Sequence, residues 1–163
     1  MGDPAHIDNR LDYLYPPFRK LVEATLAQAN HEAFDASGQP KFGPAFARYG
    51  LFEGYRSQER QRALYAQGRS RPGAIVTNTP VPGFHGYGLA ADIVWFDHAG
   101  TPHWDGPAEI WQLLGHAART QGLDWGGEWR FKDEPHVQWY VEGMHETPSD
   151  NAKALYEPAT QNK

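Results

Sequence analysis

The chain has 163 residues, a formal net charge of −5 at pH 7 and no cysteine. This is the usual length of one domain, which can bury roughly 70% of its unfolded surface. The lack of cysteine excludes disulfides and thiolate metal ligands, and no run of Lys or Arg indicates a nucleic-acid partner. We therefore expect a single domain over residues 1–163 that acts as a monomer and binds no nucleic acid.

The two ends of the chain look different from its middle. Residues 1–16 are polar and end in a Pro pair, which predicts an irregular arm, and the polar tail at about 147–163 is expected to be mobile. The first ten residues lack the basic and then apolar pattern of a signal peptide, and no apolar run approaches the roughly 20 residues that span a bilayer. We expect synthesis in the cytoplasm without a signal peptide, no membrane insertion, and a functional core at about 40–145.

The first half of the chain predicts two helices, one strand and a long loop. Apolar residues recur at three- and four-residue steps over 18–34, which is typical of an amphipathic helix. Residues 51–55 are short and apolar enough for a strand, and Ser57 is suited to cap a helix over 58–67. Residues 69–84 hold three Pro and two Gly, so we expect a loop that wraps toward a functional site.

The second half predicts more strands and one helix. Residues 89–96 form the clearest strand pattern, followed by a turn at 97–100 and a short returning strand. A further helix is expected, capped by Asp105 and opened by Pro107. The last predicted strand covers 137–141. Strands interrupted by separate helices, with hairpin-like connections, indicate an α+β fold with a small antiparallel sheet flanked by helices.

Three residues in two separate motifs predict a metal site. His85 precedes the clearest strand, Asp92 lies seven positions later on it, and His136 comes just ahead of the last strand. Two ligands of one metal on a helix sit three or four positions apart, so a separation of seven does not fit a helix, but it fits a loop ligand and a strand ligand that converge. Two His, one Asp and an open fourth position form the ligand set of a catalytic zinc. We expect one Zn²⁺ per chain.

A spare acid stands beside the last of these histidines. Asp133 or Glu134 is the carboxylate that a zinc hydrolase needs to accept a proton from bound water. Pro135 prevents a regular helix here and makes alternation unreliable, so the local pattern leaves the choice between the two acids open. The other histidines show no comparable arrangement, although two of them flank a turn and could form a second site at the rim with nearby acids: His98 and His103, with Asp97 and Asp105.

With these motifs, the sequence resembles the L-alanyl-D-glutamate peptidases of phage endolysins and bacterial autolysins, within the zinc D,D-carboxypeptidase family. The resemblance covers about residues 50–140 and is carried by four parts of the chain: Glu53-Gly54-Tyr55-Arg56-Ser57 with Arg60 and Leu64-Tyr65, Ile75-Val76-Thr77-Asn78, His85 to Asp92, and Trp125 to Gln138. It implies a Hedgehog/D,D-peptidase-like zinc peptidase fold with zinc on His85, Asp92 and His136. It also implies Asp133 as the catalytic base. Relatives usually carry Ser two residues before the first His, where this chain has Gly83.

The resemblance extends to substrate and role. It implies that Arg56 stabilises negative charge on the attacked carbonyl oxygen, and that the substrate is the peptidoglycan stem peptide, cut between L-Ala and D-Glu. We expect a groove at Tyr87, Trp125 and Trp129 to hold this peptide. A phage or prophage endolysin that acts on the cell wall in the periplasm after release fits best. The alternatives are a D,D-carboxypeptidase or D-Ala-D-Ala dipeptidase with the same zinc site, or a non-catalytic wall-binding module.

Overall fold

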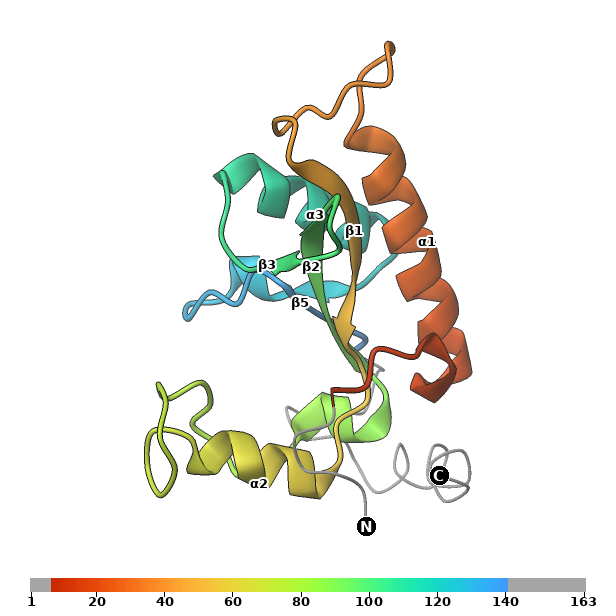
Figure 1. The fold of residues 1–163 in the computed structure, drawn as a ribbon. Helices are drawn as coiled ribbons and strands as arrows, with labels where there is room; N and C mark the ends of the chain where they lie inside the picture. Colours follow the sequence, from red (N-terminus) through yellow and green to blue (C-terminus); the bar gives the residue numbers. More distant parts are fainter. Residues whose placement is uncertain (1–6, 141–163) are drawn as a thin grey trace.

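The structure, a computed structural model, describes residues 7–140, in which three α-helices flank one sheet of five strands (Figure 1). The helices are α1 (Pro16–Glu32), α2 (Gln58–Ala66) and α3 (Ala108–Thr120), with short 3₁₀ turns at Leu11–Tyr13, Gly83–Tyr87 and Gly126–Glu128. The strands are β1 (Phe46–Glu53), β2 (Ala90–Asp97), β3 (Pro102–His103), β4 (Asp124–Trp125) and β5 (His136–Gln138). The predicted α+β class with a small antiparallel sheet is confirmed.

Strand β2 is the centre of the sheet. The order is β1-β2-β5-β4, β3 pairs with the other end of β2, and every pair is antiparallel. Asp92 on β2 lies opposite Glu53 of β1 on one side and opposite His136 of β5 on the other. Neighbouring strands therefore place three polar residues in one row across the sheet.

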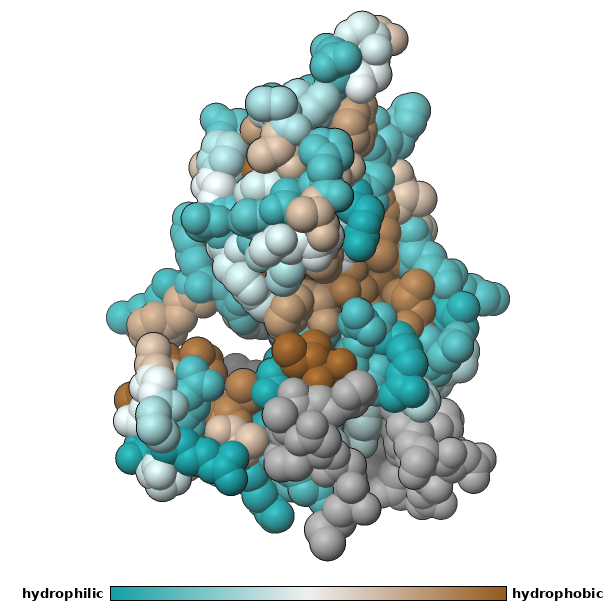
Figure 2. All heavy atoms as spheres, viewed as in Figure 1, coloured by the Kyte–Doolittle hydropathy of each residue, from teal (hydrophilic) through white to brown (hydrophobic). Residues whose placement is uncertain are grey.

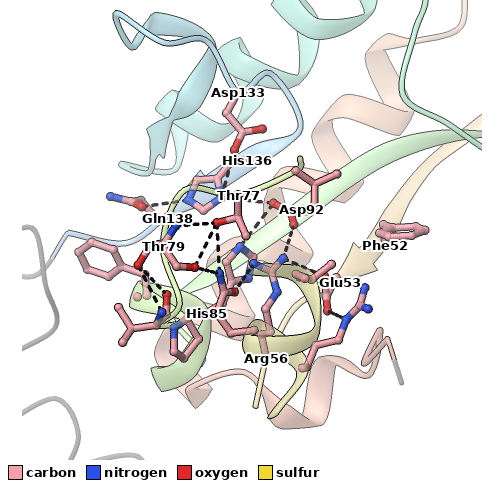
Figure 3. Close-up of a pocket in the computed structure, with 18 of the residues that line it drawn as sticks. Phe52, Glu53, Arg56, Thr77, Thr79, His85, Asp92, Asp133, His136 and Gln138 are labelled. Carbon is pink, nitrogen blue, oxygen red and sulfur yellow. Dashed lines mark hydrogen bonds and ion pairs between the residues drawn. The ribbon is translucent and has the colours of Figure 1, made fainter. Parts of the chain in front are cut away.

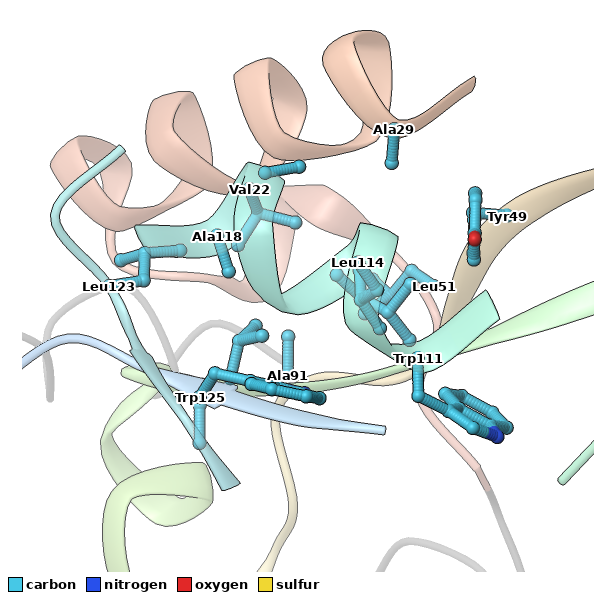
Figure 4. Close-up of a cluster of buried hydrophobic side chains, with 14 of the residues drawn as sticks. Val22, Ala29, Tyr49, Leu51, Ala91, Trp111, Leu114, Ala118, Leu123 and Trp125 are labelled. Carbon is cyan, nitrogen blue, oxygen red and sulfur yellow. The ribbon is translucent and has the colours of Figure 1, made fainter. Parts of the chain in front are cut away.

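Helices α1 and α3 pack against each other and against the sheet (Figure 4). Pro16 and Pro17 occupy the first two positions of α1, where a missing N–H costs little. The predicted stripes are buried or partly buried, with Val22 and Leu114 at 0% exposure. Burying a side chain of this size contributes about 1.5–3 kcal/mol. Although α1 precedes the 40–145 range expected for the functional core, its side chains belong to the same hydrophobic core.

The indole of Trp125 is packed between two glycines. A Cβ at Gly115 of α3 would lie 2.3 Å from Cε3 of this indole, and one at Gly127 would lie 2.1 Å from Cζ2. Neither position can therefore carry a side chain without moving the ring. The indole Nε1 donates to the carbonyl of Glu134 at 2.7 Å, so the buried ring also holds the segment that leads into β5.

Helix α2 lies at one end of the sheet, away from α1 and α3 (Figure 1). As predicted, Ser57 caps it: its hydroxyl accepts from the Arg60 N–H at 3.1 Å. The predicted loop after α2 has almost no regular structure, and side chains of α2 hold it in place. Gln58 Nε2 donates to the Pro80 carbonyl at 2.7 Å, and Gln61 Nε2 donates to the Thr79 carbonyl at 2.8 Å.

Two local predictions were wrong. Strand β1 begins at Phe46 rather than at residue 51, because pairing with β2 extends it and the Arg48 guanidinium covers the ring of Phe96 at 4.3 Å. Asp105 does not cap α3: Pro107 takes the cap position, and the Asp105 carbonyl accepts a hydrogen bond from Trp95 Nε1.

The arm before residue 7, the predicted end of the last strand at Val141 and the tail lie outside the described residues. Among the helices of residues 7–140, none has the length and apolar character needed to cross a bilayer.

Candidate metal centre and cavity

His85, Asp92 and His136 converge at the row of polar residues on the sheet (Figure 3). Asp92 and His136 face each other on β2 and β5, and His85 comes from the 3₁₀ turn just before β2. Their potential ligand atoms all lie within 4.8 Å of one another, and each residue is buried. Within the described part of the chain, this is the only group of three or more such side chains with that geometry.

Each imidazole has one nitrogen turned away from the cluster and bonded to a protein oxygen. His85 Nδ1 lies 2.7 Å from the Gly54 carbonyl, and His136 Nε2 lies 2.9 Å from Gln138 Oε1. With an N–H on these outer nitrogens, a neutral ring presents the lone pair of the other nitrogen to the cluster. Such outer hydrogen bonds are those that orient metal-binding histidines.

The atoms that converge are then all acceptors. Asp92 Oδ1 lies 3.5 Å from His85 Nε2 and 3.2 Å from His136 Nδ1. Two lone pairs and a carboxylate oxygen at such distances repel unless a proton or a metal cation lies among them. This donor set of two imidazoles and one carboxylate fits a divalent metal, and zinc is among those it suits.

Charge in the cluster shifts the pKa values in opposite directions. Burial would raise the pKa of Asp92, but the histidines His85 and His136 outweigh it and hold this pKa well below its ordinary value. Burial would lower the pKa of His136, but the hydrogen bond and charge of Asp92 raise it overall. Asp92 is therefore ionised, as a metal ligand must be, and a bound metal would compete with protonation of His136.

Arg56 lies directly beside the cluster. Its Nη2 donates to Asp92 Oδ2 at 3.1 Å and to Glu53 Oε2 at 2.8 Å, and its Nη1 donates to Gln61 Oε1 at 3.1 Å. Glu53 is only 3% exposed and also accepts from Arg60 Nε at 3.0 Å. Arg56 is thus held at the metal cluster by three separate partners.

A cavity of ≈ 630 Å³ opens at this cluster. One wall is α2 and the loop after it, and the other comes from the segment before β5; Figure 2 shows the hollow between the α2 lobe and the body of the molecule. Asp133 lines the cavity, with its Oδ2 4.0 Å from His136 Nδ1 and about half of its side chain exposed (52%). Partial burial raises the pKa of Asp133 above its ordinary value. Glu134 does not line the cavity.

Only one of the three aromatic residues expected at the cavity lines it. Trp129 lines it, with its ring 5.0 Å from that of His136. Trp125 is instead a core residue, 7% exposed, and Tyr87 packs against the core; neither lines the cavity. Trp104 and Phe52 also line the cavity, with their rings edge to face and the ring centroids 4.6 Å apart. Neither residue was predicted from the sequence to lie there.

Three further polar residues at the site were assigned no role from the sequence. Gln138 lies two positions after His136 on a strand, so alternation could have placed both on one face. Gln61 gave no comparable signal, because polar residues on a short, polar helix look solvated, and Arg60 entered only as part of the resemblance to the family. The suggested rim site is not found: His103 pairs with Asp97 at 2.9 Å, and His98 bonds the Pro44 carbonyl at 3.0 Å.

Comparisons with known proteins agree with this geometry. Residues 77–139 match the M15 peptidase family model described as D-alanyl-D-alanine carboxypeptidase. The chain is 40% identical over 135 residues to the peptidoglycan L-alanyl-D-glutamate endopeptidase CwlK of Bacillus subtilis. The aligned region covers 77% of this chain and 72% of that protein.

Solved structures show the same fold. The L-Ala D-Glu endopeptidase ChiX of Serratia marcescens matches with a TM-score of 0.55 and 23% identity, over 80% of this chain and 83% of that one. The L,D-carboxypeptidase DacB of Streptococcus pneumoniae matches with a TM-score of 0.50 and 20% identity, over 94% and 76%. The identity to CwlK extends over most of both chains, and residues 77–139, which match the M15 family model, include His85, Asp92 and His136; this chain therefore belongs to the M15 family of metallopeptidases.

Proposed function

We propose that this protein is a zinc-dependent peptidoglycan endopeptidase that cuts the bond between L-Ala and D-Glu of the stem peptide. The observation that carries the proposal is the convergence of His85, Asp92 and His136 at a cavity, in a chain 40% identical to an L-alanyl-D-glutamate endopeptidase. These three residues would hold one zinc ion. When bound, zinc acts as a Lewis acid and lowers the pKa of a coordinated water to about 7.

Asp133 is the proposed general base and then general acid. It is the acid of the pair that lines the cavity, whereas Glu134 does not. Its pKa is raised from the ordinary value toward neutral pH. A carboxylate with such a pKa more readily accepts a proton from the attacking water and returns it to the leaving amine. A hydrogen bond from its own N–H to the Gly126 carbonyl, at 2.9 Å, fixes the backbone that carries it.

Arg56 provides a fixed positive charge where the tetrahedral intermediate becomes negative. Its guanidinium side chain is 13% exposed and held by three partners, so it needs little reorganisation during the reaction. A preorganised charge of this kind is worth most where water is excluded. Trp129, at the cavity and beside His136, is proposed to contact the bound peptide.

Every group proposed for the reaction comes from one chain, which supports a monomer that acts as one domain. The biological role that we propose is lysis of the cell wall by an endolysin. Light scattering of the purified protein tests the first statement, and release of the protein by a co-expressed membrane pore in a bacterial host, followed by lysis, tests the second.

The activity is tested on purified peptidoglycan sacculi, with the new amino termini identified. We expect new D-Glu termini with the zinc-loaded protein, and none after chelation or with Asp133→Asn. Glu134→Gln is the matched control, because it alters the neighbouring acid, and it should retain cleavage.

Two other outcomes of this assay would contradict the proposal. New D-Ala termini would move the cut to the D,D bond, which the description of the matching family model favours. No new termini at one bound zinc per chain would reject the proposal. Elemental analysis of the protein with and without His136→Ala tests the metal independently of activity.

A further inference from the structure

The α2 side of the cavity carries more positive than negative charge. Arg56 and Arg60 both line the cavity, and both bind the same buried carboxylate, Glu53. Arg56 also shares Asp92, but Asp92 belongs to the metal cluster as one of its three candidate ligands. One glutamate therefore serves two guanidinium groups, and this wall retains unbalanced positive charge.

The two arginines differ in how many hydrogen-bond donors they have left. A guanidinium has five N–H donors. Arg56 uses three of them, on Glu53, Asp92 and Gln61. Arg60 uses only its Nε, on Glu53, and its terminal nitrogens make no hydrogen bond within residues 7–140.

Those terminal nitrogens are not fully buried, and the residue that carries them lines the cavity. Among the described residues, the only buried side-chain nitrogen or oxygen without a partner is Nε of Arg56. The unbonded nitrogens of Arg60 are therefore accessible, although the side chain as a whole is 15% exposed and lines the cavity. The bond from Nε to Glu53 and the Ser57 cap of α2 hold the group in place. A guanidinium that is held in this way, with its two terminal nitrogens unbonded, is suited to bind a second carboxylate.

The proposed substrate supplies such a carboxylate, and this step rests on the proposed function. A glutamyl residue inside a peptide uses its amino group and one of its two carboxyl groups, so the other remains an anion. That anion would be repelled by the acids that line the cavity: Glu53, Asp92 and Asp133. Arg60 is the cation of the wall with more donors left, because Arg56 uses three of its five and Arg60 uses one.

We propose that Arg60 binds the free carboxylate of the D-Glu residue on the amine side of the scissile bond. The site thereby selects an acidic residue at this position. It also orients the substrate, with the acid turned toward α2 and away from Asp133.

The experiment compares two synthetic stem peptides that are identical except that the free carboxyl of the D-Glu after L-Ala is a carboxylate in one and a carboxamide in the other. Each zinc-loaded protein is assayed on both, and the ratio of kcat/KM for the acid over the amide is the readout. The ratio comes from one preparation, so any fraction of misfolded protein cancels. The variants are Arg60→Met, Arg60→Lys, and Arg62→Met as a control on the exposed side of the same helix.

We expect the wild-type protein to prefer the acid by about tenfold to a hundredfold, the range for a hydrogen bond to a charged group. Arg60→Met should bring the ratio close to one, and Arg60→Lys should leave an intermediate ratio, because lysine keeps the charge and loses the fork. Arg62→Met should keep the wild-type ratio.

Two results would overturn the inference while leaving the proposed function intact. One is equal cleavage of acid and amide by the wild-type protein. The other is an unchanged ratio in both Arg60 variants, since an Arg60 that only balances the charge of Glu53 would affect both substrates alike. If the wild-type protein cut neither peptide, the proposed function would fail, and this inference with it.

Discussion

Replacing Gly115 by Ala should destabilise this protein, although the same change in most helices is favourable. Gly115 lies within α3, where Ala is preferred over Gly by about 1 kcal/mol. The new Cβ, however, would lie 2.3, 2.4 and 2.6 Å from three carbons of the Trp125 indole. Carbon atoms in favourable contact are about 3.5–4.0 Å apart, so the ring would have to move by roughly 1 Å or more.

The ring has little freedom to move. Gly127 blocks its other side, and its Nε1 is bonded to the Glu134 carbonyl at 2.7 Å. Overpacking in a dense core costs about 1–3 kcal/mol. Taking the upper part of that range and subtracting the helix gain gives a net loss of about 2 kcal/mol. For a chain of this size, the loss corresponds to a fall in Tm of about 4–8 °C.

The consequence should extend to the metal centre, because Trp125 anchors the carbonyl two residues before His136. We expect Gly115→Ala to weaken zinc binding as well as lower the Tm, measured by thermal unfolding of the metal-free protein and by zinc titration. In a Trp125→Phe background the overlapping indole carbons are absent, so the penalty should shrink. A Tm equal to or above that of the wild-type protein would refute the packing argument, since helix propensity alone predicts a rise.

Two further predictions concern other parts of the molecule. Gln61→Met removes the amide that joins Arg56 to Thr77 and Thr79, and it should lower kcat/KM about tenfold, as for one lost hydrogen bond to a charged group. Gln58→Met frees the same loop at Pro80 without touching Arg56, so it should leave kcat/KM unchanged. Equal loss in both would assign the effect to the loop alone. The hydrogen bonds from His103, Thr101 and Ala99 lower the pKa of Asp97 to about 2, so the stability that this carboxylate provides is complete above about pH 4 and is lost as the pH falls toward 2. The Tm difference between wild-type protein and Asp97→Asn should therefore shrink over that interval, and a difference independent of pH would contradict it.

Much of this protein could be predicted from local sequence. The stripes of α1 and α3, the Ser57 cap and the alternation in β2 depend on residues a few positions apart, so a linear reading captures them. The proximity of His85, Asp92 and His136 could also be predicted, because each lies in or next to a short strand pattern. The start of β1 could not, since its first residues are set by pairing with β2.

The identity of the cavity walls was decided only by the tertiary structure. Trp125 and Trp129 are four residues apart in a Gly-rich segment, yet one ring is enclosed by Gly115 and Gly127 and the other faces the cavity. The same holds for the neighbouring acids Asp133 and Glu134. Which side of an irregular segment faces inward depends on the elements packed against it, and those elements come from distant parts of the chain. The residue types therefore determined the chemistry that the site can hold, whereas long-range packing determined which of these residues line it.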